Sequence, residues 1–269
     1  MSNSAQPEPG GSTLESLLKR DRIVIGSALT ALTLLCWAYL VWMAAAMSGM
    51  PDSMGDAMAM TQIPEWNAGY FGMMFTMWAI MMVGMMVPSA APMILLFATV
   101  NRNRQEQGQP YVPTAAFAAG YLIIWTLFSL AATLLQWRLD EAMLLSPMMV
   151  STSPLLGGGL LIAAGVYQMT PLKQACLKHC RSPLQFVMTN WRNGTRGALR
   201  MGIEHGTFCL GCCWILMGLL FFGGVMNLIW IAAIAIFVLL EKVAPLGDKA
   251  GMISGVPMVI IGLAVMFRG

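Results

Sequence analysis

One segment of the chain gathers four side chains that bind soft metal ions. Within EHGTFCLGCCW, residues 204–214, a histidine and three cysteines stand at relative positions 0, 4, 7 and 8: His205, Cys209, Cys212 and Cys213. At about 100° per residue, an α-helix places all four within an arc of roughly 100°. Imidazole and thiolate together select soft or borderline ions, chiefly Cu(I) and Zn(II). A lone membrane cysteine is ordinarily a small packing residue, but this stripe predicts metal binding or redox chemistry.

A second group of ligands follows in TPLKQACLKHCRSP, residues 170–183. Cys176, His179 and Cys180 fit on one helical turn or in one compact turn. Their order, CxxHC, differs from the CxxCH pattern that attaches haem, so covalent haem is excluded. The segment fits a second soft-metal site, and it fits equally well surface thiols in a basic loop. The spacing leaves open whether this group and the first one form a single site.

Methionine is the second chemical signal, with 26 residues in a chain of 269. Five of them stand among Gly, Ser and Asp in a predicted outer loop, residues 48–69, or just before it: Met47, Met50, Met54, Met58 and Met60. A thioether binds Cu(I) without losing a proton and forms no disulfide in an oxidising compartment, so such a loop suits copper capture. The alternative is a flexible apolar loop that lies in the membrane interface.

More methionines line the next apolar segment, MMFTMWAIMMVGMMVP. Met77, Met81 and Met85 fall on one helical face, which is either a packing surface or a row of copper ligands. Pro88 and Pro92 should disturb the lower half of this helix and make a cavity plausible. Because residues 81–86 and 209–213 lie at similar depths, we hypothesise that the two faces meet near the midplane of the membrane.

The elements that must position these groups are membrane helices. Hydrophobic residues make up 58% of the chain and charged residues 10%, and the mean hydropathy is +0.69, values that exceed what the surface of a soluble domain tolerates. We predict an all-α bundle of about seven transmembrane helices in a single membrane domain, residues 23–267. The predicted helices are 23–47, 70–99, 114–137, 154–170, 200–222, 228–244 and 252–267. Segment 154–170 is short and contains Gly157, Gly158 and Gly159, so six helices remain an alternative.

The basic residues predict the orientation of this bundle, because cytoplasmic loops retain positive charge. With residues 1–22 as a cytoplasmic tail and 171–199 as a basic inner loop, thirteen of the fifteen Lys and Arg residues lie inside. They are Lys19, Arg20, Arg22, Arg102, Arg104, Lys173, Lys178, Arg181, Arg192, Arg196, Arg200, Lys242 and Lys249. Only Arg138 and Arg268 fall outside. We therefore expect the N-terminus in, the C-terminus out, an uncleaved signal anchor and a place in a bacterial inner membrane.

Other chemistry finds little support in the sequence. It has no Gly-rich phosphate loop, no HExxH helix and no GxSxG turn, and it contains only two histidines. This favours a protein that is not an enzyme, and a net charge of +3 gives no reason to expect a nucleic acid partner. Cys36 is expected to be a packing residue, and Glu241 and Lys242 an interfacial pair without chemistry.

Three blocks of sequence resemble a known family. WAIMMVGMMVPSAAPM, GVYQMTPLKQACLKHCRSP and GIEHGTFCLGCCWILMGLLFFGGVMNLIWIAAIAIFVLLEK occur in this order. Together they resemble DUF2182, a bacterial family of predicted metal-binding integral membrane proteins, over roughly residues 70–265. The resemblance implies a multi-helix membrane fold and metal binding, without assigning an activity. It also implies that the metal-binding positions are His205, Cys209, Cys212, Cys213, Cys176 and Cys180.

The leading hypothesis is a soft-metal membrane protein that binds, transports or delivers Cu(I), with zinc as the alternative metal. The outer methionines would collect the ion, the intramembrane Met, Cys and His residues would bind it, and Cys176, His179 and Cys180 would exchange it with a metallochaperone or a membrane partner subunit. Two rivals remain. A membrane thiol oxidoreductase could use Cys209, Cys212 and Cys213, with Cys176 and Cys180 as a relay, and Cys209 and Cys212 have CxxC spacing. A non-catalytic assembly subunit could pack the Gly157 to Gly159 stretch against a partner helix.

Overall fold

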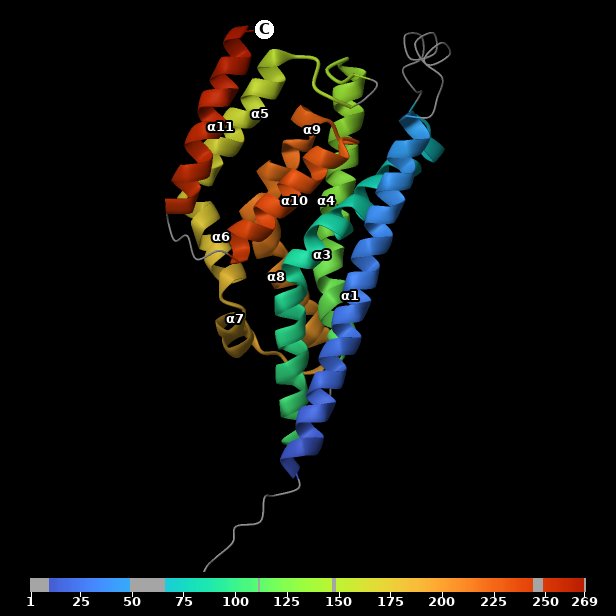
Figure 1. The fold of residues 1–269 in the computed structure, drawn as a ribbon, viewed down its shortest axis with the longest axis vertical. Coiled ribbons are helices and arrows are strands. Elements are labelled where there is room, and N and C mark those ends of the chain that lie inside the picture. The colour runs from blue at the N-terminus through green and yellow to red at the C-terminus, as the bar shows by residue number, and fades with distance from the viewer. Residues whose placement is uncertain (1–9, 49–65, 111, 147–148, 244–248, 269) are drawn as a thin grey trace, which may run out of the picture.

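The computed structural model describes residues 10–48, 66–110, 112–146, 149–243 and 249–268 (Figure 1). Within these ranges the secondary structure is helical apart from one isolated antiparallel bridge between Leu145 and Ser151, so the predicted all-α class is confirmed there. In chain order the helices are α1 (Gly10–Ser48), α3 (Ala68–Glu106), α4 (Thr114–Glu141), α5 (Pro154–Gln168), α6 (Pro171–Arg181), α7 (Pro183–Asn190), α8 (Gly194–Gly218), α9 (Leu220–Gly223), α10 (Leu228–Val243) and α11 (Lys249–Arg268).

The number of helices that could cross a membrane is smaller than predicted. Four are long and apolar enough: Arg22–Ala46, Ala68–Glu106, Thr114–Glu141 and Gly194–Gly223. A fifth exists if α5 and α6, which bend by 65° at their junction, count as one span. The prediction of about seven must be corrected because α10 has only 16 residues and the apolar part of α11, Ile253–Phe267, is also short of the roughly 20 that a span needs. The long apolar helices are compatible with a membrane protein.

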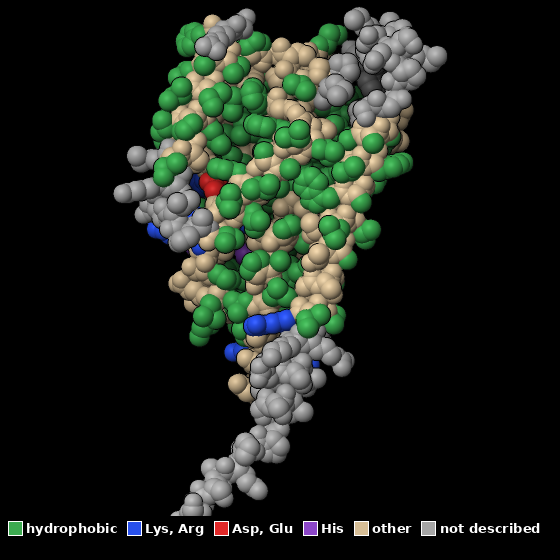
Figure 2. Space-filling model, in the orientation of Figure 1, with side chains coloured by type: hydrophobic (Ala, Val, Ile, Leu, Met, Phe, Trp, Pro, Cys, Tyr) green, Lys and Arg blue, Asp and Glu red, His purple; other side chains and the backbone are tan. Residues whose placement is uncertain are grey.

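The helices pack in pairs: α5 and α11 run antiparallel, whereas α4 and α8 run parallel. In Figure 1, α5 and α11 lie together on one side, α1 and α3 on the other, and α8 and α10 between them. The start of α1 and the end of α11 lie at opposite ends of the long axis. Hydrophobic side chains cover the upper part of the face drawn in Figure 2, and the Lys and Arg side chains visible there lie in its middle and lower part.

Glycines allow two of these pairs to approach closely. On α4 and α8, a Cβ added at Gly120 would overlap the carbonyl oxygen of Leu199, and one at Gly202 would overlap that of Phe117. On α5, a Cβ at Gly158 would meet Met266 and the backbone of Gly262 in α11. Gly158 therefore packs α5 against α11 of the same chain. This contact gives no support to the alternative in which the glycines pack against a partner subunit.

The bend between α5 and α6 is encoded locally. Thr170 caps α6 by accepting a hydrogen bond from the amide of Lys173 (3.3 Å), and Pro171 occupies the first turn of α6, where its missing N–H costs nothing. Two short helices, α6 and α7, therefore occupy the segment predicted as an inner loop, and α6 packs against α8. The bend thereby turns a cysteine-bearing helix toward the stripe on α8.

The core is rich in methionine. Met74, Met77, Met81, Met82, Met85 and Met86 are all buried in α3. Cys36 of α1 is buried against Gly84 of α3, where a Cβ would lie 3.0 Å from the Cβ of Cys36. Cys36 is accordingly a packing residue, as expected from its isolation in the sequence.

Candidate metal site

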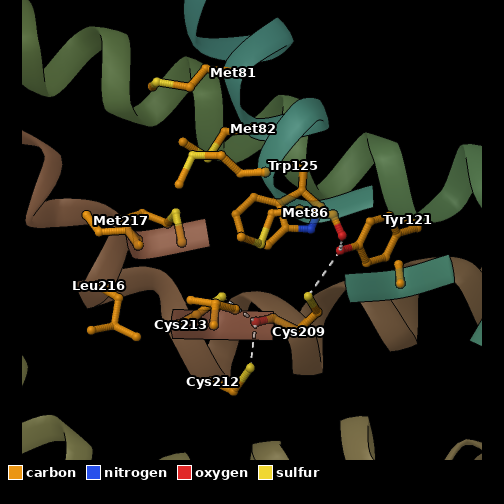
Figure 3. Packing of buried hydrophobic residues seen from close by; sticks show 14 of the residues in the cluster. Met81, Met82, Met86, Tyr121, Trp125, Cys209, Cys212, Cys213, Leu216 and Met217 are labelled. Carbon is orange, nitrogen blue, oxygen red and sulfur yellow. Dashed lines mark hydrogen bonds between the residues drawn. The ribbon is translucent and has the colours of Figure 1, made fainter. Parts of the chain in front are cut away.

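The four predicted ligands of α8 are buried on one side of that helix. His205, Cys209, Cys212 and Cys213 are each no more than 3% exposed. The thiols of Cys212 and Cys213 both donate to the backbone carbonyl of Cys209, each over 3.0 Å (Figure 3). These are local bonds to the preceding turn of the same helix, and they pair both thiol groups.

Helix α6 brings two more thiols to this stripe. Cys180 interacts through its thiol with Cys209 and Cys212. Cys176 lies beside Gly211, where a Cβ would come within 2.8 Å of the Cys176 sulfur. The two groups of ligands seen in the sequence therefore adjoin in space. We call Cys176, Cys180, Cys209, Cys212 and Cys213 the thiol cluster; none of these cysteines is in a disulfide.

His179 is oriented differently from its neighbours in CxxHC. Its side chain is exposed, its ring stacks on Phe208 with centroids 4.1 Å apart, and its Nδ1 contacts the carbonyl oxygen of Ala175 at 2.9 Å. These contacts do not involve a cysteine. His179 stays a predicted ligand, at the exposed edge of α6.

Lys242 of α10 reaches the centre of the thiol cluster. Its Nζ donates to the sulfur of Cys209 at 2.9 Å and to the hydroxyl of Ser89 in α3 at 2.8 Å. Glu241 instead forms a buried ion pair with Lys173 of α6, at 2.7 Å. The expectation that Glu241 and Lys242 form one interfacial pair is therefore wrong. Adjacent helical residues point about 100° apart, which directs these two toward different helices.

Tyr121 of α4 completes the surroundings of Cys209. Its hydroxyl lies 3.2 Å from the Cys209 sulfur and donates to the carbonyl of Met86 in α3, also over 3.2 Å (Figure 3). An ammonium group directed at a sulfur atom favours a thiolate, whereas the one proton of the Tyr121 hydroxyl is given to the Met86 carbonyl. Sequence reasoning gave Lys242 no chemical role and did not single out Tyr121. The available signal was a polar side chain within an apolar helix, which usually marks a functional position in a membrane protein.

His205 lies one helical turn from Cys209. Its ring packs between Phe117 and Tyr121, with centroids 6.0 and 5.8 Å away, and Phe186 contacts its edge. In the part of the chain that the structure describes, its buried Nδ1 has no hydrogen-bond partner. Buried polar atoms are nearly always paired, so this nitrogen is available to a ligand.

The methionines of α3 approach the cluster from the other side. Met77, Met81 and Met85 are at most 2% exposed. In Figure 3, Met82 and Met86 lie between Met81 and the cysteines. The contact of α3 with the cluster runs through Met86 and Ser89, by way of Tyr121 and Lys242. Met77, Met81 and Met85 remain predicted ligands, and most of the predicted outer loop, including Met50, Met54, Met58 and Met60, lies outside the described residues.

The cluster is not organised as a finished metal site. Among the described residues, no three side chains of His, Cys, Asp or Glu are arranged to hold a metal ion. The thiols adjoin, and those of Cys212 and Cys213 donate their hydrogen bonds to the Cys209 carbonyl. An arriving soft ion would exchange these weak bonds for metal–sulfur bonds.

Comparison with known proteins points to a copper-related family. The model of a family described as PpoB2, copper chaperone, matches residues 75–265. This range contains α4 to α10 and all five cysteines of the thiol cluster. No curated protein and no solved structure matches the chain. The match agrees with the metal-binding family that the sequence resembles and gives copper as its metal, whereas the DUF2182 designation remains a resemblance.

Proposed function

The chain belongs to the PpoB2 copper chaperone family, and from this premise we propose that it binds Cu(I) at the thiol cluster and delivers it to a partner. The observation that carries the proposal is that the cysteines of α6 adjoin the buried cysteines of α8, with Lys242 and Tyr121 next to the Cys209 sulfur. Thiolates are soft ligands that favour Cu(I) and Zn(II) over hard ions, and the copper chaperone family favours copper of the two.

The surplus of thiols suits delivery. An ion held by two sulfur atoms has further thiols within reach, so it can change partners one bond at a time. Cys176 and Cys180 are only partly buried, whereas the three cysteines of α8 are buried. We therefore propose that the ion is kept at α8 and leaves by way of α6, where His179 lies at the exposed edge. The receiver would be a metallochaperone or a membrane partner subunit.

The membrane setting belongs to the same proposal. The long apolar helices support insertion into a bilayer, and the distribution of Lys and Arg supports an orientation with the N-terminus in the cytoplasm. In this orientation the segment between α1 and α3, with its methionines, faces outward and would collect copper. A bacterial inner membrane is the setting that fits. Zinc stays a competitor that the binding experiment must exclude.

The first test is metal binding by the purified protein. The chain is prepared in detergent under anaerobic, reducing conditions and supplied with Cu(I) or Zn(II), and bound metal is measured by mass spectrometry. We expect near-stoichiometric copper in the wild type and a loss of tight binding in the Cys212→Ser, Cys213→Ser variant. Cys36→Ser is the matched control, because Cys36 is also buried but lies in α1 against Gly84.

The outcomes separate the candidate functions. Copper bound equally by the double variant and the wild type would refute the site. Zinc bound in preference to copper would keep the site and refute the copper assignment. Loaded vesicles would then show whether copper crosses the membrane or is only delivered from it.

The thiol oxidoreductase alternative loses support from burial. Cys209 and Cys212, the pair with CxxC spacing, are 0% and 2% exposed. Thiol–disulfide exchange requires an attacking thiolate to reach a sulfur of its partner. A partner protein has no such access to these two sulfur atoms in this arrangement.

A further inference from the structure

A pair of thioethers lies at the other end of the methionine stripe of α3. The side-chain amide nitrogen of Gln136 in α4 contacts the sulfur of Met74 at 3.5 Å and that of Met149 at 3.3 Å. Gln136 is fully buried, and Met74 and Met149 are 4% and 7% exposed. Two sulfur atoms from distant parts of the chain thus converge on one nitrogen atom.

The orientation of the Gln136 amide is fixed by a third contact. Its oxygen accepts a hydrogen bond from the indole nitrogen of Trp78 over 2.7 Å, so its nitrogen must face the two thioethers. A thioether is a weak acceptor, and a buried amide donor is usually paired with a carbonyl or a hydroxyl. The amide N–H groups therefore occupy the space between two soft ligands without binding strongly to either.

The backbone of Met149 is held in an uncommon conformation. Its φ is +55°, in the left-handed region that residues other than glycine seldom adopt. Ser146 holds the turn, because its carbonyl accepts from the amide of Met149 (2.8 Å) and its hydroxyl accepts from that of Val150 (3.2 Å). The amide of Ser151 is fixed to the carbonyl of Phe221 at 2.8 Å. Outliers of this kind concentrate at functional sites, where the surrounding structure maintains them.

We propose that Met74 and Met149 form a second Cu(I) site, distinct from the thiol cluster. An arriving ion would displace the Gln136 amide nitrogen from between the two sulfur atoms. Neutral thioethers bind Cu(I) without releasing a proton and more weakly than thiolates do, so this site would hold the ion briefly. Met74 precedes Met86 by 12 residues, about 18 Å of helix at 1.5 Å per residue. The buried methionines Met77, Met81, Met82 and Met85 lie between them.

This inference rests on the proposed Cu(I) function and adds a second binding site to it. The Cu(I) ion would move between the two sites by binding to successive methionines of α3, from the thioethers at one end to the thiols at the other. The gain in affinity along this path would favour movement toward the thiol cluster.

The test is a Cu(I) titration of the full-length protein against a chromogenic Cu(I) chelator under anaerobic conditions. We expect two classes of site in the wild type. Met74→Leu and Met149→Leu should each weaken the weaker class by about tenfold or more and leave the tighter class unchanged. Met73→Leu is the matched control, because Met73 is the neighbour of Met74 and is 49% exposed.

The reciprocal variant separates this site from the thiol cluster. In Cys212→Ser, Cys213→Ser protein the tighter class should disappear and the weaker one remain, with an X-ray absorption spectrum of sulfur ligation that is lost when Met149→Leu is added. A single class of site that responds only to the cysteine changes would overturn the thioether site and leave the proposed function intact. No Cu(I) bound by the wild type would overturn both. A weaker class that responds equally to Met73→Leu and Met74→Leu would also refute the site.

Discussion

Lys242 gives the thiol cluster a fixed positive charge. A Cu(I) ion held by two thiolates carries a net charge of minus one, which the ammonium group beside Cys209 cancels. A divalent ion held in the same way would be neutral, so the ammonium charge would remain uncompensated in a buried site. Because uncompensated charge is costly in an apolar interior, Lys242 should favour the monovalent ion.

Removing this charge should reduce the preference for copper. In Lys242→Met we expect the ratio of Cu(I) affinity to Zn(II) affinity to fall at least about tenfold, as judged from a Coulomb interaction of a few kcal/mol at this range. The measurement is competition of each metal against a chelator of known affinity. Lys242→Arg should preserve the ratio, and Lys178→Met, which removes an exposed lysine from α6, should not alter it. An unchanged ratio in Lys242→Met would show that the ammonium group has no part in selection.

At the scale of helices, the approach of α4 to α8 positions the ligands. Gly120 and Gly202 let the two backbones touch, and this contact sets Tyr121 beside Cys209 and packs His205 against Phe117. A larger residue at the contact would separate the helices. It would also move the Tyr121 hydroxyl away from the Cys209 sulfur.

Gly202→Ala should therefore destabilise the fold by about 1–3 kcal/mol, because the added methyl group has no space beside the Phe117 carbonyl. The matched control is Gly159→Ala in α5, where no atom lies within 4 Å of the added Cβ. There the better helix propensity of alanine should leave stability unchanged or slightly raised. The check is the midpoint of thermal unfolding in detergent. Similar midpoints for the two variants would contradict the close contact.

The sequence identified some of these elements and missed others for physical reasons. The spacing of His205, Cys209, Cys212 and Cys213 was enough to predict one buried stripe, because side-chain direction within a helix follows from residue number alone. The neighbours of Cys209 were not predictable in this way, because Lys242 and Tyr121 reach it from helices 33 and 88 residues away in the chain. The Thr170–Pro171 start signal was readable, and it would have identified α6 as a helix within the segment 171–199 that was predicted as an inner loop.

At the scale of the whole molecule, the proposed orientation predicts which surfaces face each side of the membrane. Met143, just after α4, is 72% exposed and belongs to the outer side, whereas exposed Arg196 at the start of α8 belongs to the inner side. In intact cells, a membrane-impermeant maleimide should label Met143→Cys and spare Arg196→Cys. Inverted vesicles should give the reverse pattern. If the two patterns were exchanged, the positive-inside assignment would be incorrect.

The end of α10 carries its acidic residue directly before its basic one, and that order determines how the helix must be rotated about its axis. Glu241 faces Lys173, and the Glu241 carbonyl accepts from the Arg181 guanidinium, while Lys242 faces the Cys209 sulfur and the Ser89 hydroxyl. Exchanging the two residues would leave composition and net charge as they are. It would nevertheless place an ammonium group next to Lys173 and a carboxylate next to the Cys209 sulfur, which is stabilised by a cation. The order of Glu241 and Lys242 in the sequence thus fixes the rotation of α10 about its axis, because only one rotation satisfies the contacts of both residues.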